Sequence, residues 1–283
     1  MSRTAYVNGA YVPMEMAFVH IEDRGYQFAD GVYEVVSIRR GKLIDEEAHL
    51  TRLKRSLDEL RISVPMSRAA MKLIFREVIR RNRVSDALLY IQVTRGVAKR
   101  DHAFPKNATP SLVITCRRFD FDAVKKRSKM GIKVSSQPDN RWGRCDIKSV
   151  SLLPNCLAKQ AAKEAGAFEA LLVDTAGYVT EGSSTNMWMV DASGTLITRP
   201  TTDNILPGIT RASLMKIAAE LQMPIEERPF SLEEAKTAKE LFLTSSTSCA
   251  MPVVDLDGQA IGDGTPGTVA QRLAEAYWAF MDA

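Results

Sequence analysis

The sequence has few of the residues that form cross-links or bind metals. It contains four cysteines and three histidines among 283 residues, and no two cysteines stand at C-x-x-C spacing. A disulfide framework or a structural zinc centre is built from such clusters, so we expect neither, and we predict no metal site. The scarcity of cysteine fits a reducing compartment.

Long apolar runs and strong charge of one sign are also missing. No stretch of about 18 apolar residues occurs, and the first thirty residues lack an apolar run behind a basic head, so we expect neither a membrane span nor a signal peptide. The formal net charge is +4, and basic clusters such as Lys125-Lys126-Arg127 are short. We therefore predict no nucleic-acid partner, no membrane association and a cytoplasmic location.

What is present describes an ordinary globular chain that is long enough for two domains. Hydrophobic residues make up 45% and charged residues 25% of the sequence. Single hydrophobic cores stop growing at roughly 250 to 300 residues, which favours two domains here. The stretch before Gly131 is polar, basic and without periodicity. We predict a smaller domain over residues 1–120, a connection over 121–133 and a larger domain over 134–283.

The first half combines strands with two helices. Asn8-Gly9 stands between two apolar triplets, which is a strong signal for a β-hairpin. Leucines at helical spacing predict a helix over 46–61, and Ser67 is expected to cap a second helix. Strands are expected at 32–36, 88–93 and 111–115. This pattern is typical of an α+β domain.

The second half also mixes helices and strands. A helix is expected over 153–165, ended by Gly166, and Ser231-x-x-Glu234 has the form of a capping box. Further helices are expected at 211–223 and 269–281, and strands near Leu171, near Met187 and at 241–243. We predict an α+β fold with mixed and antiparallel sheets flanked by helices.

Two familiar signatures do not carry a function here. The segment from Gly262 to Gly267 formally matches G-x-G-x-x-G, but too few residues follow it for a βαβ unit, so we expect a turn. Ser213-Leu-Met-Lys216 matches S-x-x-K without the companion motifs of that nucleophile class. Both matches are explained by chance.

Three separated segments, in order, resemble one known family. They are "DRGYQFADGVYEV" (23–35), "RCDIKSVSLL" (144–153) and "VTEGSSTNMW" (179–188). Together they resemble the fold type IV pyridoxal-phosphate aminotransferases, and most of all the D-amino-acid transaminases, over a range from the first hairpin to about Val254. The resemblance implies a two-domain fold type IV enzyme with its active site at the domain interface, pyridoxal 5'-phosphate as cofactor, and a homodimer.

Lys148 is the candidate catalytic residue. It follows a strand-like stretch just before the helix expected from Leu153. A lysine that is desolvated there has a lowered pKa, which frees its amine to attack an aldehyde, although most lysines lie on protein surfaces. The resemblance implies that Lys148 forms the Schiff base with the cofactor. It also implies that Lys148 moves the proton between the substrate α-carbon and the cofactor.

The resemblance assigns further residues to the cofactor. Glu181 would bind the pyridine nitrogen, Arg52 the phosphate, and Leu206 would pack against the ring. Taken alone, Glu181 is equally well an exposed loop residue, Arg52 an exposed helix residue and Leu206 a core residue.

Two short segments have the chemistry of a phosphate site. Ile209 and Thr210 open a predicted helix, whose N-terminal N–H groups suit an anion. Ser245, Ser246 and Thr247 follow a predicted strand and offer hydroxyl groups. Each segment taken alone is also an ordinary cap or turn.

Substrate recognition is assigned to a loop arginine and its neighbours. Arg100-Asp101-His102 resembles the R-x-H element by which D-amino-acid transaminases hold the substrate carboxylate, with Tyr33 assisting. The alternative is a basic loop with a solvent-facing histidine. Two positions depart from the family pattern: Ala29 replaces a usual glycine, and Cys249-Ala250-Met251 is unusual, which leaves the side-chain preference open.

The reaction expected from the resemblance is a ping-pong transfer of the amino group from a D-amino acid, such as D-alanine or D-glutamate, to a 2-oxo acid. One alternative is a 4-amino-4-deoxychorismate lyase, against which Arg100 and His102 argue. Others are a branched-chain L-amino-acid aminotransferase of the same fold and a silent relative that only binds. The silent relative is disfavoured because the lysine, glutamate, arginine and phosphate-loop matches are all present.

Overall fold

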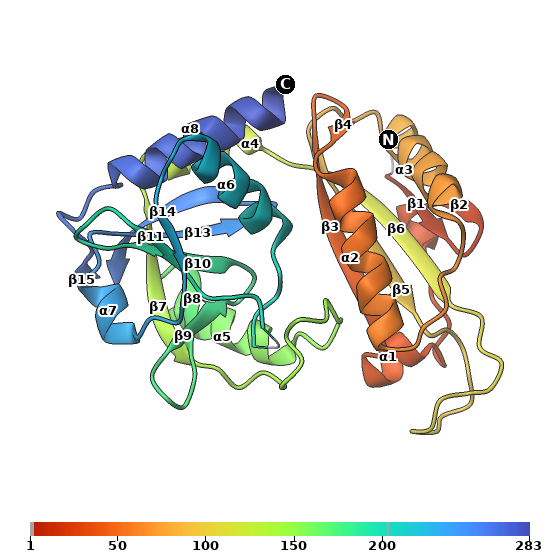
Figure 1. Ribbon diagram of the computed structural model, residues 1–283. Helices are drawn as coiled ribbons and strands as arrows, with labels where there is room; N and C mark the ends of the chain where they lie inside the picture. Colours follow the sequence, from red (N-terminus) through yellow and green to blue (C-terminus); the bar gives the residue numbers. More distant parts are fainter. Residues whose placement is uncertain (1–2, 203) are drawn as a thin grey trace. The chain divides into compact units, whose positions relative to one another are not determined.

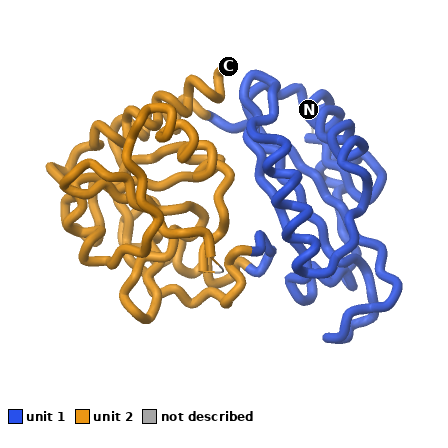
Figure 2. The backbone as a smooth tube through the Cα atoms, in the orientation of Figure 1, with its two compact units in different colours: residues 1–120, 147–151 blue, residues 121–146, 152–283 orange. Residues whose placement is uncertain are grey.

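A computed structural model describes residues 3–202 and 204–283 of the chain, which divide into two compact units (Figures 1 and 2). Unit 1 extends to Asp120 and includes Ile147–Ser151, and unit 2 consists of Phe121–Asp146 and Leu152–Ala283. Residues 121–133 were expected to form a connection between two domains. They belong to unit 2, where they form helix α4 (Phe121–Ser128) and the start of a strand.

Unit 1 is built on an antiparallel six-stranded sheet with the order β2-β1-β6-β5-β3-β4. Its strands are β1 (Thr4–Val7), β2 (Ala10–Pro13), β3 (Gly31–Arg39), β4 (Lys42–Leu43), β5 (Ala87–Thr94) and β6 (Ser111–Arg118). The hairpin predicted at Asn8-Gly9 is confirmed, and both turn residues have positive φ, 46° and 101°. A two-residue turn with positive φ at both positions matches the twist of the strands that it joins.

Two long helices cover one face of this sheet (Figure 1). They are α2 (Glu46–Glu59) and α3 (Arg68–Asn82), and the Ser67 side chain accepts a hydrogen bond from the Ala70 N–H at the start of α3, as predicted. Leu53 and Leu57 of α2 and Phe75 of α3 are at most 2% exposed. Burial of each such side chain contributes roughly 1.5 to 3 kcal/mol.

A short helix that periodicity does not predict precedes β3. Helix α1 (Arg24–Phe28) is capped by Asp23, whose side chain accepts from the Gly25 N–H, and a 3-10 turn, Met14–Met16, lies earlier in the chain. Helix α1 ends at Ala29, which has φ 55° and ψ 27°. That is the left-handed region, where a side chain costs about 1 to 2 kcal/mol relative to the favoured right-handed conformation. The glycine that is usual in the resembling family suits this position without that cost.

Unit 2 contains a nine-stranded mixed sheet with the order β12-β11-β10-β13-β14-β7-β8-β9, and β15 pairs with β14. Strand β7 pairs in parallel with both β14 and β8, and β11 pairs in parallel with β12. The strands are β7 (Ile132–Pro138), β8 (Glu169–Val173), β9 (Val179–Gly182), β10 (Asn186–Val190), β11 (Leu196–Thr198), β12 (Ile225–Glu227), β13 (Glu240–Ser245), β14 (Cys249–Leu256) and β15 (Gln259–Ala260).

Four further helices belong to unit 2. They are α5 (Leu153–Glu164), α6 (Ile209–Glu220), α7 (Leu232–Lys236) and α8 (Thr268–Asp282). The predicted capping box is confirmed, because Ser231 and Glu234 each bond the main-chain N–H of the other. The segment from Gly262 to Gly267 forms turns that lead into α8, as expected.

The described residues form neither a membrane-spanning helix nor a metal-binding cluster. None of the helices in the described part of the chain is long and apolar enough to cross a membrane. Among the same residues, no cluster of histidine, cysteine, aspartate or glutamate side chains is suited to a metal ion.

A buried charged cluster joins α2 to β3 in unit 1. The Glu34 side chain is fully buried, and Arg52 donates to its two oxygens from Nε and Nη2 at 2.8 and 2.8 Å. The Nδ1 atom of His49 lies 2.7 Å from Oε2 of Glu34. Burial alone raises the pKa of Glu34, but the charge and hydrogen bonds of Arg52, with the bond to His49, outweigh burial and lower the pKa to about 2. The carboxylate is therefore ionised at neutral pH.

The substitution Glu34→Gln tests this cluster. At pH 7 we expect it to lower the free energy of unfolding by about 3 to 5 kcal/mol, because it leaves the Arg52 charge buried without its counter-charge. The folded-state pKa lies below the unfolded value, so the wild-type contribution is complete above the unfolded pKa and is lost as the pH falls from about 4.5 toward 2. The gap between wild type and variant, measured by urea denaturation, should narrow over that range.

The matched control is Glu77→Gln. Glu77 also bonds two arginines, Arg80 and Arg81, but it does so at the surface of α3, where water screens the charges. Its replacement should leave the urea midpoint nearly unchanged. Equal losses at the two positions would contradict the role given to burial.

Candidate active site

The segment that carries Lys148 forms part of unit 1, whereas the sequence suggested the larger, second domain. Its main chain pairs with the start of β3: the Tyr33 N–H donates to the Lys148 carbonyl at 3.0 Å, and the Val150 N–H donates to the Gly31 carbonyl at 3.0 Å. The Lys148 N–H donates to Oγ of Ser56, on α2, at 3.2 Å. The backbone of the lysine is thus fixed by both the sheet and the helix.

The amine of Lys148 lies over an aromatic ring. Its Nζ atom is 4.3 Å from the centroid of the Tyr33 ring, and Tyr33 stacks on Tyr90 at 5.7 Å between centroids. A cation over a ring face at this distance is attracted by the ring quadrupole. The structure therefore brings together two predicted site residues, Lys148 and Tyr33. Lys148 is half-buried and is not the fully exposed surface lysine that was the alternative.

Arg52, another predicted site residue, is held by Glu34, the neighbour of Tyr33 in β3. Tyr33 and Glu34 are neighbours in a strand, so their side chains face opposite sides. Glu34 faces α2, where it binds Arg52, whose side chain is 8% exposed. Arg52 is therefore not an exposed helix arginine, and its guanidinium is held in one orientation by two hydrogen bonds.

In unit 2 the carboxylate of Glu181, at the end of β9, is 5% exposed and held from several sides. Its Oε1 accepts a hydrogen bond from Nη1 of Arg141. Its Oε2 accepts from Nδ2 of Asn186 at 3.0 Å and from the Leu206 N–H at 3.1 Å. The alternative of an exposed loop glutamate is wrong. Leu206, the residue expected beside the cofactor ring, is tied directly to Glu181.

Arg141 is a site residue that the sequence did not indicate. Besides Glu181 it binds Asp139, with Nη2 at 2.7 Å from Oδ2, and its side chain is 6% exposed. Burial lowers the pKa of Arg141, but the neighbouring carboxylates of Asp139 and Glu181 raise it by more than burial lowers it, so the net shift is upward. Burial raises the pKa of Asp139, but the hydrogen bonds and charge of Arg141, with a hydrogen bond from Thr180, outweigh burial and lower it. Arg141 remains a cation between two carboxylates. It lies on a loop with no recognisable motif, so no local signal could have identified it.

Three segments of unit 2 meet at one end of its sheet. Asn186, which opens β10, pairs with Thr244 of β13 and also donates from Nδ2 to the Leu206 carbonyl at 2.9 Å. Gly208 packs so closely that a Cβ atom there would lie 1.9 Å from Oδ1 of Asn186. The segments 181–186, 206–210 and 244–247 are therefore neighbours, although they are far apart in sequence.

The two predicted phosphate segments belong to this group. Helix α6 begins at Ile209, two residues before the predicted start. Its N-cap residue is Gly208, which has no side chain to cap the first N–H groups, and Thr210 is 3% exposed. Oγ of Ser245 lies 3.2 Å from Oγ1 of Thr247 and accepts from the Ser248 N–H at 3.0 Å. Ser246 stands between the two. A helix N-terminus beside a cluster of hydroxyls has the chemistry of an anion site.

Arg100 and His102 lie elsewhere in unit 1, on the loop between β5 and β6. Both residues are exposed. The Phe28 ring lies beside them, with its centroid 5.0 Å from Cζ of Arg100 and 5.5 Å from the His102 ring centroid. In the described part of the chain neither residue forms a hydrogen bond or ring contact with Tyr33 or Lys148. Unit 1 by itself does not bring the four predicted residues together.

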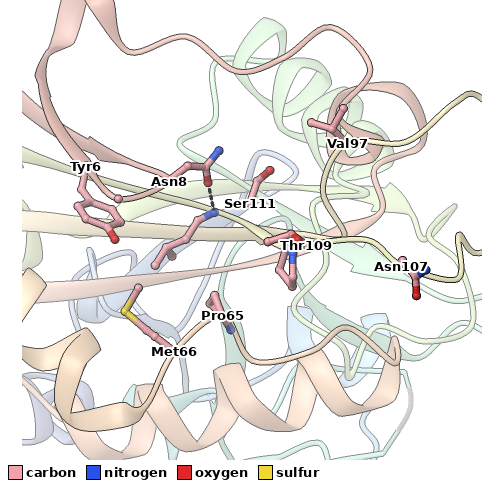
Figure 3. Close-up of a pocket in the computed structure, with 11 residues that line it drawn as sticks. Tyr6, Asn8, Pro65, Met66, Val97, Asn107, Thr109 and Ser111 are labelled. Atoms are coloured by element: carbon pink, nitrogen blue, oxygen red, sulfur yellow. Dashed lines mark hydrogen bonds between the residues drawn. The ribbon is translucent and has the colours of Figure 1, made fainter.

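A cavity of about 460 Å³ in unit 1 is a separate feature (Figure 3). None of the predicted site residues lines it, and Asn8, which faces it, is engaged by the Leu112 N–H at 2.7 Å. Its lining residues include no histidine, cysteine, lysine, arginine, aspartate or glutamate. The cavity does not have the chemistry of the site described above. Its walls are Tyr6, Asn8, Gly9, Pro65, Met66, Val97, Asn107, Thr109, Pro110, Ser111 and Leu112.

Known proteins resemble this chain over almost its whole length. The family model described as amino-transferase class IV matches residues 31–256, from β3 to β14. A D-alanine aminotransferase of Bacillus licheniformis is 40% identical over 269 residues, which are 95% of this chain and 94% of the relative. A D-alanine aminotransferase of Staphylococcus epidermidis is 34% identical over 98% of both chains.

Solved structures share the fold. A branched-chain amino acid aminotransferase from T.th., in complex with N-(5'-phosphopyridoxyl)-L-glutamate, matches with a TM-score of 0.89 at 26% identity, over 100% of this chain and 95% of its own. A branched-chain aminotransferase from Escherichia coli matches with a TM-score of 0.88 at 25% identity, over 99% and 95%. The α+β fold expected from the three motifs is shared with these enzymes, and the chain belongs to the class IV amino-transferases.

Proposed function

We propose that this protein is a pyridoxal-phosphate-dependent D-amino-acid aminotransferase, which moves the amino group of a D-amino acid such as D-alanine or D-glutamate to a 2-oxo acid in a ping-pong reaction. The observation that carries the proposal is the 34–40% identity, over nearly the full chain, to D-alanine aminotransferases. The R-x-H element at Arg100 and His102 supports the same substrate class.

The described side chains fit pyridoxal phosphate. The cofactor needs an amine, a carboxylate for its ring nitrogen, an apolar contact and an anion site for its phosphate. Lys148, Glu181 and Leu206 would supply the first three. Arg52, Ile209, Thr210 and Ser245–Thr247 would supply the last. The hydroxyl of Thr185, which packs against Gly182, is buried with no hydrogen-bond partner in the described structure and leaves a polar atom for a ligand.

When bound, the cofactor supplies an electron sink for the charge that develops at the substrate α-carbon. Glu181 would hold the ring nitrogen protonated. Its own orientation is fixed by Arg141, Asn186 and the Leu206 N–H, so the carboxylate does not need to reorganise during turnover.

Lys148 would hold and move the proton at the substrate α-carbon. Its main chain is fixed by Tyr33 and Ser56, so only side-chain torsions move the amine. General acid and base catalysis of this kind requires the group to stay within hydrogen-bond reach of the reacting carbon's proton. The aromatic ring of Tyr33 beside the amine reduces its access to water on that side.

The substitution Lys148→Ala tests the cofactor link. Wild-type protein with added pyridoxal phosphate should develop a visible absorption band. Borohydride should then fix the cofactor to the peptide that contains Lys148, as read by mass spectrometry. The variant should lose both the fixation and more than about 1,000-fold of the turnover, because it lacks the nucleophilic amine. Lys163→Ala, an exposed lysine on α5, is the control and should behave as wild type. Fixation at another lysine would refute the assignment.

The choice of substrate is tested with one assay panel and Arg100→Ala. We expect D-alanine with 2-oxoglutarate to be turned over at least about 100-fold faster than L-leucine. The variant should lose about 100-fold in kcat/KM for D-alanine, because a guanidinium that binds a carboxylate contributes up to about 3 kcal/mol. Lys99→Ala, which removes an exposed cation from the same loop, is the matched control.

Each rival predicts a different result in that panel. A branched-chain enzyme, the activity named for the structural neighbours, would turn over L-leucine and be indifferent to Arg100→Ala. A lyase would release pyruvate from 4-amino-4-deoxychorismate. A silent relative would act on neither enantiomer of any amino acid.

We also propose that the protein is a homodimer. Between β2 and β3 of unit 1, a run of apolar side chains is exposed to water: Met16, Phe18, Val19, Ile21 and Tyr26 are 59%, 71%, 49%, 76% and 76% exposed. Several large apolar side chains exposed within one short stretch of chain are typical of a segment that is covered by a partner. We propose a second copy of this chain, and no other protein, as the partner that covers these side chains, because the family resemblance implies a homodimer. The cytoplasmic location expected from the sequence remains a prediction.

Sedimentation measures the oligomeric state directly. The wild type should sediment as twice the 31.4 kDa chain. Ile21→Lys should shift the distribution toward the monomer, because it places a charge in the apolar face. Val64→Lys, which alters an exposed apolar residue away from the run, should have no effect. A wild-type monomer at micromolar concentration would argue against the homodimer.

A further inference from the structure

A second buried charged cluster lies in unit 1, where β3 begins and β5 ends. Oδ2 of Asp30 accepts hydrogen bonds from Nε of Arg24 at 2.8 Å and from Nε of Arg95 at 2.7 Å, and Oδ1 accepts from Nη2 of Arg95 at 3.0 Å. The side chains are 3%, 10% and 7% exposed for Arg24, Asp30 and Arg95. One carboxylate therefore holds two buried guanidinium groups, and none of the three residues has a place in the proposed chemistry.

The remaining donors of the two arginines bind main-chain carbonyls. Arg95 donates to Leu60 at 2.7 Å and to Arg61 at 2.9 Å, just after α2 ends. Arg24 donates from Nη1 to the carbonyl of Asp101, and more weakly to that of Ala103 at 3.4 Å. The cluster thus joins the end of α2 to the tip of the loop between β5 and β6. Asp101 is the residue between Arg100 and His102.

The Phe28 ring of α1 supports the same loop. The Cζ atom of Arg24 lies 4.8 Å from the ring centroid, that of Arg100 lies 5.0 Å from it, and the His102 ring centroid lies 5.5 Å away. A guanidinium group over an aromatic face is attracted by the quadrupole of the ring. Both side chains of the R-x-H element therefore rest on one aromatic residue.

The base of the loop is closed by a close main-chain approach. Gly96 has φ +96°, and a Cβ atom there would lie 1.9 Å from the Thr109 carbonyl oxygen. The Arg24 N–H donates to the Gly96 carbonyl at 2.9 Å. Figure 1 shows the loop between β5 and β6 extending past the end of the sheet. The main chain is held as far as Ala98, whose N–H donates to the Glu22 carbonyl at 3.3 Å. The rest of the loop has no helix or strand of its own, so side-chain contacts such as those of Arg24 and Phe28 contribute to its conformation.

We infer that Arg24 and Phe28 are positioning residues that hold Arg100 and His102 in the conformation that binds the substrate carboxylate. The inference rests on the proposed function, because it is the D-amino-acid reaction that gives Arg100 and His102 this role. Recognition of a carboxylate by a guanidinium is directional, so a loop that is already ordered loses less entropy on binding. The carboxylate is bound in both the ground state and the transition state. Loss of the support should therefore raise KM and leave the limiting rate nearly unchanged.

The experiment uses the holoenzyme and two variants. Arg24→Lys keeps a cation beside Asp30 but loses the fork that reaches the Asp101 carbonyl. Phe28→Leu removes the ring, and with it the ring contact of Arg24, but leaves every ion-pair partner in place. In both we expect the KM for D-alanine to rise about five- to twentyfold with a kcat within twofold of wild type and an unchanged cofactor spectrum. Arg80→Lys on α3 and Phe280→Leu on α8 are matched controls of the same chemistry at exposed sites. A wild-type KM in both variants would overturn the inference.

A second measurement separates this inference from the proposed function. Hydrogen exchange of peptides covering residues 97–107 should quicken in Arg24→Lys and Phe28→Leu, and not in the controls, whatever amino acid the enzyme prefers. Unchanged exchange in folded variants overturns the inference. Absence of D-alanine turnover by the wild type would overturn the proposed function. The exchange result would still show whether Arg24 and Phe28 order the loop between β5 and β6. Should Arg24→Lys fail to fold, Phe28→Leu decides the question by itself, because it leaves all ion-pair partners in place.

Discussion

The pairing of Ile147–Ser151 with the start of β3 is the constraint on which the candidate active site depends. Residues on either side of this short segment belong to unit 2, yet the segment itself bonds to Gly31 and Tyr33 of the sheet in unit 1. These hydrogen bonds, with that from the Lys148 N–H to Ser56, decide where the amine can reach. The chain therefore passes between the units at residues 120, 146 and 151, and the candidate catalytic lysine is placed by elements from the first third of the sequence.

Buried ion pairs orient side chains around the candidate active site. Three clusters combine carboxylates and guanidinium groups away from water: Glu34 with Arg52, Glu181 with Arg141, and Asp30 with Arg24 and Arg95. Desolvation of both partners largely cancels the attraction between them, so such clusters add little net stability compared with apolar packing. What they add is orientation, because a bidentate guanidinium fixes two planes at once. Each cluster contains or adjoins a residue assigned to the cofactor or the substrate.

The parts of the fold that could be predicted from the sequence are those determined by neighbouring residues. The turn at Asn8-Gly9 and the caps at Ser67 and Ser231 depend on backbone conformation and hydrogen bonds within four residues, so a single sequence contains the whole signal. Strand β14 is not among the expected strands. Its first five residues are all buried and apolar, so it lacks the alternation that identifies a half-exposed strand.

The candidate site divides in the same way. Motifs indicated Lys148, Glu181 and Arg52, but not the groups that hold them, because the partners are distant in sequence. Arg141 is 40 residues from Glu181, and Ser56 is 92 residues from Lys148. No periodicity or local spacing encodes a contact of that range. The assignment of Lys148 to unit 1 could not be predicted for the same reason, since it requires knowing which strand the segment joins.

The structure also gives a physical reading of the unusual segment Cys249-Ala250-Met251. All three side chains are 0% exposed, and Sγ of Cys249 lies 3.7 Å from Sδ of Met281 in α8. Cys249 has φ 55° and pairs with Ser245 across the turn that contains Thr247. In the isolated chain these side chains pack within unit 2 and do not present a group to a ligand. The departure from the family pattern therefore lies directly beside the turn that carries the proposed phosphate hydroxyls, because Cys249 pairs with Ser245 at its base.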